Sequence, residues 1–129
     1  MRLLLDTHLL IWLAAEDQRL SPEAVTLIED DRNVLVFSVV SLWEIAIKSG
    51  LERPGFRVHP RDFWQELLEN GYEQLLITPE HAFAVLDLPR RHKDPFDRML
   101  IAQARAERVT LLTADRRLAG YGPPVRLIT

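Results

Sequence analysis

Acidic residues stand at four places where the surrounding sequence is apolar. Asp6 ends one short apolar run and Asp115 closely follows another, while Glu44 interrupts a largely apolar helical pattern and Asp97 heads a mostly apolar helical stripe. Clustered carboxylate oxygens are ligands suited to magnesium or manganese. Such ions activate a water and stabilise the attacking and leaving oxygens at a phosphate. The four residues therefore predict a metal-dependent hydrolase of phosphodiester bonds.

Each carboxylate also has an ordinary structural explanation. Asp6 and Asp115 could cap the helices that follow them. Glu44 lies four residues before Lys48 and could pair with it on a solvated stripe. Asp97 could be a first-turn acid favoured by the helix dipole. Because four separate explanations would have to coincide, we favour a shared site.

Three neighbouring residues are predicted to support this site. Asp94 is followed by Pro95, the pattern of a helix N-cap with proline at the first helical position, so we assign it to capping and not to metal binding. Thr7 and Thr113 flank proposed ligands and could orient a carboxylate or a metal-bound water. A buried threonine at a strand end is the alternative explanation for both.

The chain alternates short apolar runs with helical patterns. The runs, which we predict to be strands, are 3–5, 34–37, 75–77, 110–113 and 125–128; the predicted helices are 8–15, 22–30, 39–49, 60–70, 79–86 and 95–108. This alternation predicts one α/β domain over residues 1–129, with three α/β/α layers and a parallel sheet of about five strands. Ligands of such sheets bind beyond the carboxyl ends of the strands, where Asp6 and Asp115 fall.

Composition narrows the classes of function. The chain of 129 residues is 47% hydrophobic and 27% charged and has no cysteine, which excludes disulfides, zinc–thiolate sites and cysteine nucleophiles. The net charge of −3 argues mildly against nucleic-acid binding, but metal ions on the carboxylates would themselves attract phosphate. The apolar segment 2–15 contains Asp6 and His8 and is too short to span a bilayer, so we expect no membrane association and a cytoplasmic protein.

Four segments around the acidic residues resemble the motif blocks of bacterial PIN domains, in the same order. They are LLDTH at 4–8, SLWEI at 41–45, HKDPFDRMLIAQA at 92–104 and LTAD at 112–115. The third block is the most specific. The resemblance extends over nearly the whole chain, and the acidic positions of the family match Asp6, Glu44, Asp97 and Asp115.

The resemblance implies a PIN fold and a magnesium- or manganese-dependent endoribonuclease acting on RNA. It also implies a VapC-type toxin of a type II toxin–antitoxin pair, which is often a homodimer and is held inactive by a small antitoxin. Two alternatives stay open: an RNA-processing nuclease outside such a pair, and a catalytically silent module that binds a protein. A receiver domain is disfavoured because no aspartate ends the run 75–77, and a haloacid-dehalogenase phosphatase because His8 stands where its second aspartate would be.

Two other surfaces are candidates for partners. The basic segment Arg90, Arg91, His92 and Lys93 precedes the third acidic block and could contact an RNA backbone, with a solvated loop as the alternative. The other histidines lack metal-ligand spacing, so we expect surface or capping roles for them. Residues 9–15 and 39–47 are more apolar than one domain needs, so we expect one of these helices at a dimer or antitoxin interface.

Overall fold

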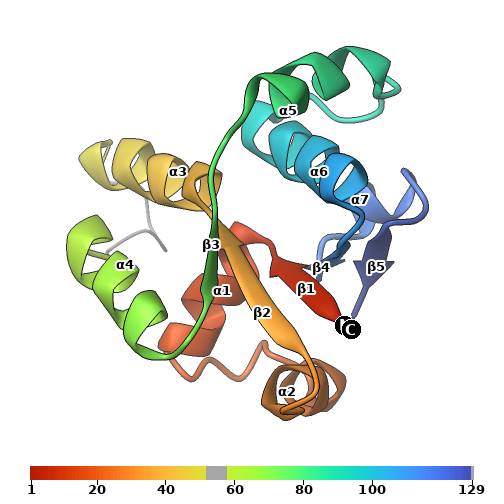
Figure 1. Ribbon diagram of the computed structural model, residues 1–129. Helices are drawn as coiled ribbons and strands as arrows, with labels where there is room; N and C mark the ends of the chain where they lie inside the picture. Colours follow the sequence, from red (N-terminus) through yellow and green to blue (C-terminus); the bar gives the residue numbers. More distant parts are fainter. Residues whose placement is uncertain (52–57, 129) are drawn as a thin grey trace.

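The computed structural model describes residues 1–51 and 58–128 and contains one parallel sheet (Figure 1). Its strands lie in the order β3-β2-β1-β4-β5. They are β1 (Arg2–Leu5), β2 (Val34–Ser38), β3 (Glu73–Leu75), β4 (Thr110–Thr113) and β5 (Val125–Leu127). The predicted α/β class and the five parallel strands are confirmed.

The helices connect these strands and cover the sheet. They are α1 (Thr7–Ala14), α2 (Pro22–Glu29), α3 (Val39–Gly50), α4 (Pro60–Glu69), α5 (Pro79–Ala84), α6 (Pro95–Glu107) and α7 (Arg116–Ala119), with a 3-10 helix η1 (Val85–Asp87) after α5. Proline occupies the first turn of α2, α4, α5 and α6, where its missing N–H costs nothing. Within the described residues, no helix is long and apolar enough to cross a membrane.

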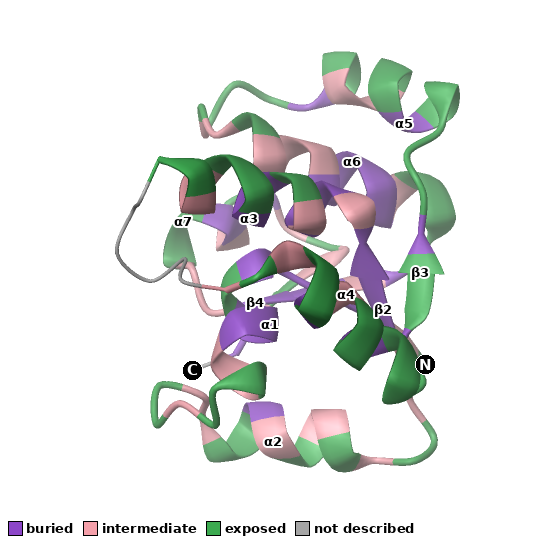
Figure 2. Ribbon diagram, turned by 90° about the vertical axis from the view of Figure 1, so that its left-hand side faces the viewer, coloured by how far each residue is buried: buried purple, intermediate pink, exposed green. Residues whose placement is uncertain are grey.

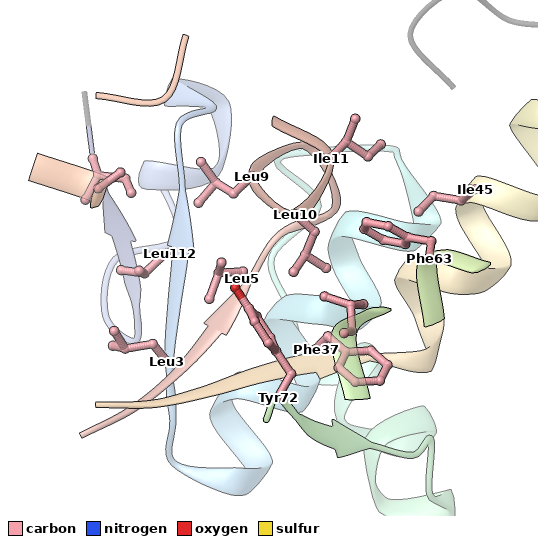
Figure 3. Packing of buried hydrophobic residues seen from close by; sticks show 13 residues of the cluster. Leu3, Leu5, Leu9, Leu10, Ile11, Phe37, Ile45, Phe63, Tyr72 and Leu112 are labelled. Carbon is pink, nitrogen blue, oxygen red and sulfur yellow. The ribbon is translucent and has the colours of Figure 1, made fainter. Parts of the chain in front are cut away.

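Two hydrophobic clusters lie on opposite faces of the sheet. Alternate residues of β1 divide between them. Leu3 and Leu5 pack with α1, α2 and α4 (Figure 3), whereas Leu4 packs with α6 on the other face. The central strands are buried on both faces, and exposed residues concentrate on outer helices such as α5 (Figure 2). The helix α3 contributes to both clusters, through Val40 to one and Ile45 to the other. It therefore crosses the edge of the sheet just beyond the carboxyl end of β2.

The third strand departs from the prediction. The strand predicted over 75–77 is wrong by two residues, because β3 covers Glu73–Leu75 while Leu76 and Ile77 are 58% and 42% exposed. As an edge strand, β3 pairs only with β2 and is not enclosed by strands on both sides. Its polar residues are therefore compatible with the sheet, and the apolar residues that suggested a strand lie on the surface.

Smaller differences concern the ends of the elements. The helix predicted over 79–86 changes to η1 after Ala84, and the helix predicted over 39–49 ends one residue later, at Gly50. The helix predicted over 60–70 ends at Glu69 with Asn70 as its C-cap, and Gly71 follows with a φ of +81° that favours glycine. The short helix α7 was not among the predicted helices, although Asp115 was considered as a possible cap for one.

Candidate active site

The sheet brings Asp6 to the carboxyl end of its central strand. Its backbone N–H donates to the carbonyl oxygen of Leu112 at 3.1 Å, continuing the pairing of β1 with β4. The side chain caps α1 by accepting from the N–H of Leu9 at 2.9 Å, and its other oxygen accepts from the hydroxyl of Thr113 at 2.5 Å. The residue is only 4% exposed. Asp6 is thus both a helix cap and a buried carboxylate.

Burial raises the pKa of Asp6 to about 6. Repulsion from Glu44 and Asp115 contributes to this raised pKa, and the hydrogen bonds from Thr113 and Leu9 oppose it. Glu44 lies on α3 and Asp115 follows β4, so charges from two other elements act on the Asp6 carboxyl.

Glu44 is buried inside the protein on α3. Its carboxylate oxygen Oε2 lies 2.5 Å from Nζ of Lys48, which confirms the predicted pairing. The residue is only 1% exposed, so the solvated stripe considered above is not what forms. Its other oxygen, Oε1, has no hydrogen-bond partner in the described part of the chain. A buried carboxylate oxygen without a partner is unfavourable unless a cation or water completes it.

Asp97 lies in the first turn of α6. Because α6 runs back along the sheet toward the start of β4, this first turn lies at the carboxyl edge of the strands. Burial raises the pKa of Asp97 to about 6, and repulsion from Asp94, Glu44 and Asp6 contributes, whereas a hydrogen bond with His92 lowers it. Nε2 of His92 lies 2.8 Å from Oδ2 of Asp97.

Asp115 lies at the margin of this group of acids. It caps α7 by accepting from the N–H of Arg117 at 2.9 Å, and the Arg117 guanidinium lies 2.8 Å from its second oxygen. This ion pair lowers the pKa of Asp115. Its own N–H donates to the Thr113 hydroxyl at 3.0 Å, so a single threonine joins Asp115 to Asp6.

The supporting residues divide into three cases. Asp94 is the N-cap of α6, as predicted, and accepts from the N–H groups of Phe96 at 2.8 Å and Asp97 at 3.2 Å. Thr113 contacts a carboxylate directly, whereas the Thr7 hydroxyl donates to that of Ser41 at 2.9 Å and ties α1 to α3. Within the described part of the chain, the hydrogen bond of the Thr7 hydroxyl is thus to α3 and not to a carboxylate.

The residues of the basic segment before α6 differ in how far they are buried. Arg90, Arg91 and Lys93 are exposed, whereas the side chain of His92 is 10% exposed and turned toward Asp97. Of the other histidines, His59 caps α4 and His81 forms a capping box with Thr78 in α5, so the capping roles expected for histidines are confirmed for these two.

Sequence reasoning missed two side chains at the site. His92 was considered for its charge and not as a partner of Asp97, although the spacing of five residues across a helix start allows the contact. Arg117 follows Asp115 by two residues, a spacing that also forms the ion pairs of Asp17 with Arg19 and of Asp30 with Arg32. The repetition of Asp-x-Arg was the signal in the sequence for the Arg117 pair.

The arrangement suits a hard divalent cation. Carboxylate oxygens are the ligands that such a cation prefers. Among the described residues, the ligand atoms that lie within 4.8 Å of one another belong to His92, Asp94 and Asp97, so this group contains Asp97 but not Asp6, Glu44 or Asp115. The unpartnered oxygen of Glu44 and the mutual repulsion of Asp6, Glu44 and Asp97 would both be relieved by a cation. The carboxylates present therefore fit a divalent cation.

Comparisons with known proteins agree with this description. Residues 3–122 match the model of the PIN domain family. Ribonuclease VapC22 of Mycobacterium tuberculosis is 34% identical over 122 residues, which cover 94% of this chain and 92% of the relative. The fold is similar to chains in the VapBC2 structure of Rickettsia felis bound to a promoter DNA fragment (TM-score 0.70, 16% identity, 99% and 98% of the two chains). It is also similar to VapBC-1 of nontypeable Haemophilus influenzae (TM-score 0.66, 19% identity, 99% and 97%).

Proposed function

Because the chain belongs to the PIN domain family, we propose that it is a metal-dependent endoribonuclease that hydrolyses RNA phosphodiester bonds. The observation that carries the proposal is the buried Glu44 carboxylate, whose oxygen Oε1 has no partner among the described residues and lies in a group of repelling acids. The similarity to a ribonuclease over 94% of the chain supports the choice of RNA as substrate.

We assign Asp6, Glu44, Asp97 and Asp115 as the residues that would hold magnesium or manganese. A bound divalent cation would supply charge to the scissile phosphate and acidify a water. The chain itself fixes its carboxylates beforehand. Thr113 and the α1 backbone hold Asp6, and Lys48 holds one oxygen of Glu44.

RNA would reach this site across exposed basic side chains. Arg90, Arg91 and Lys93 precede α6, which carries Asp97, and Arg116 and Arg117 begin α7 directly after Asp115; all five are exposed. Phosphate contacts of this kind position a strand and carry no sequence preference. We propose them as backbone contacts for the RNA.

We further propose that the protein is the toxin of a toxin–antitoxin pair and acts in the cytoplasm. Solved structures of similar fold include the two VapBC structures above and a toxin–antitoxin complex from Klebsiella pneumoniae, which supports a small antitoxin as partner. The helix α3 exposes Trp43 by 55% and Ile47 by 38%, and a groove beside it is lined by Trp43, Ala46 and Trp64. Trp43 stacks edge to face on Phe96, next to Asp97, so a partner in this groove would lie beside the site.

The test is an RNA cleavage assay on the purified chain with magnesium, manganese or a chelator. We expect cleavage only with a cation, and loss of cleavage in Asp115→Asn. Asp30→Asn is the matched control, because Asp30 makes the same Asp-x-Arg ion pair away from the site. Sequencing of RNA ends after brief expression would identify the target. Equal activity with and without a chelator, or in Asp115→Asn, would contradict the proposal.

A further inference from the structure

His92 is the one residue of the basic segment 90–93 that turns inward. Its side chain is 10% exposed, and its Nε2 lies 2.8 Å from Oδ2 of Asp97, whose side chain is 16% exposed. With the proton on Nε2, the ring donates to the carboxylate whether or not Nδ1 is also protonated. His92 is thus placed to hold a carboxylate and not to reach into solvent.

The position of His92 is itself fixed by Tyr121, which lies 29 residues later in the chain. Its backbone N–H donates to the hydroxyl oxygen Oη of Tyr121 at 3.1 Å, and Tyr121 is only 7% exposed. Nη1 of Arg98 donates to the same oxygen at 3.3 Å and to the carbonyl of Pro89 at 2.9 Å. The loop that carries His92 is therefore bound to the segment after α7 and to α6.

The bond from His92 completes the restraints on Asp97. The backbone N–H of Asp97 is held by the cap residue Asp94 at 3.2 Å, and Oδ2 is held by His92. Among the described residues, no hydrogen bond restrains the remaining oxygen, Oδ1, which belongs to the same carboxylate that repels Glu44 and Asp6. A carboxylate restrained in this way offers one oxygen in a fixed direction. Hydrogen bonds from an outer layer of residues commonly orient metal ligands in this manner.

We propose that His92 is a positioning residue that fixes the Asp97 carboxylate in the site, and that the Tyr121 hydroxyl holds His92 in place for this purpose. This inference rests on the proposed function, since it gives Asp97 a role in metal binding and RNA cleavage. It differs from the expectation that His92 contacts RNA. A phosphate contact would act on the affinity for RNA, whereas a positioning residue acts on metal binding and on turnover.

The experiment compares His92→Phe, which keeps an aromatic ring without a donor, with His92→Gln, whose side-chain amide can donate to Asp97. His59→Phe is the control for loss of an exposed histidine away from the site; because His59 is the N-cap of α4, this control should lower stability without changing the manganese response. Each full-length variant is measured for kcat and KM with RNA. The manganese concentration that gives half of the maximal thermal stabilisation is measured in parallel, without RNA.

For His92→Phe we expect kcat to fall about 10- to 100-fold and the half-saturating manganese concentration to rise by a similar factor. KM for RNA should stay within about twofold, and His92→Gln should recover most of the loss. Adding His92→Phe to Asp97→Asn should produce no further change, because the carboxylate to be positioned is gone. Tyr121→Phe, which removes only the hydroxyl, should shift both quantities in the same direction by a smaller factor. It serves as the test if His92→Phe does not fold.

The outcomes separate this inference from the proposed function. If Asp97→Asn loses cleavage but His92→Phe and Tyr121→Phe behave as the wild type, the inference is overturned and the proposed function stands. A rise in KM alone would also overturn it, because that result marks an RNA contact. If Asp97→Asn cleaves as well as the wild type, or if manganese has no effect on the wild type, both ideas fail together.

Discussion

Thr113 and Asp6 are joined across neighbouring strands by a hydrogen bond of 2.5 Å between the threonine hydroxyl and the carboxylate. The register of β1 and β4 places Leu5 opposite Leu112, so the two residues that follow meet at the carboxyl end of the sheet. The same hydroxyl oxygen accepts from the N–H of Asp115. One buried threonine thus links two of the proposed metal ligands.

Replacing Thr113 by valine should therefore destabilise the protein and impair cleavage. The substitution keeps the shape but leaves a carboxylate oxygen and a backbone N–H without their partner, which we expect to cost about 1–3 kcal/mol. Thr113→Ser should retain most of both properties. Thr110→Val at the other end of β4 is the control, since among the described residues its hydroxyl contacts only the sulfur of Met1, at 3.8 Å. Urea unfolding of the variants would measure the difference.

Asp6 and Asp97 should make the metal-free protein less stable as pH rises from about 4 to about 6. Both pKa values are raised to about 6 from the ordinary 3.8, so between these values the folded chain binds more protons than the unfolded chain. The stabilisation is complete below about pH 4 and is lost above about 6. For one group, a pKa raised from 3.8 to about 6 corresponds to a change of about 3 kcal/mol in the free energy of unfolding.

Unfolding in the presence of a chelator across this range would test the expectation. Asp6→Asn should be more stable than the wild type at pH 7 and should lose that advantage near pH 4, whereas Asp30→Asn should show no such gain. An Asp6→Asn variant with the same pH dependence as the wild type would contradict it.

Local sequence signals predicted much of this fold. Proline and cap residues located the starts of α2, α5 and α6, and the run that ends at Asp6 located β1 and the carboxyl edge of the sheet. These signals act within a few residues of the chain. They are readable without knowledge of the tertiary structure.

What the sequence left undecided depends on contacts between distant segments. In the sequence, the apolar residues Leu76 and Ile77 look like part of a buried strand. They lie on the surface because they follow β3, which is at the edge of the sheet. The bond of Thr113 to Asp6 and the anchoring of His92 by Tyr121 join residues 107 and 29 positions apart. Asp6 had two alternative explanations, as a helix cap or as a member of the acidic group. In the structure it caps α1 and is also repelled by Glu44 and Asp115.

The apolar helices lead to a prediction about partners. Leu9, Leu10 and Ile11 of α1 are buried in the protein's own core, so of the two helices considered, α3 is the better candidate for an interface. Trp43→Ser removes the contact with Phe96 from a half-exposed side chain, so it should lower the free energy of unfolding by only about 0.5–1 kcal/mol. It should weaken binding to the antitoxin measurably in titration calorimetry. An unchanged affinity for the antitoxin in Trp43→Ser would place the interface elsewhere. The homodimer remains a prediction, which analytical ultracentrifugation would test.

Asp94 and Asp97 should differ sharply in their effects on cleavage. Asp94→Asn should keep most of the stability and activity, because asparagine caps a helix nearly as well as aspartate. Asp94→Ala should cost about 1 kcal/mol of stability, since the N–H groups of Phe96 and Asp97 lose their acceptor. Asp97→Asn should fold and lose cleavage. Melting curves and RNA cleavage rates of the three variants would reveal reversed roles if our assignment is wrong.

Metal ions should stabilise the folded chain, and Asp6 should account for part of that response. Asp6, Glu44 and Asp97 repel one another in the metal-free state, and a cation that binds only the folded state raises its stability with concentration, by about 2.7 kcal/mol at 100 times its dissociation constant. Asp6→Asn removes both a repelling charge and a ligand. Its melting temperature without metal should therefore rise while its response to magnesium or manganese weakens. Thermal melting of the wild type, Asp6→Asn and the control Asp30→Asn across a metal titration would test both effects, and a metal-independent melting curve that Asp6→Asn leaves unchanged would count against a clustered metal site.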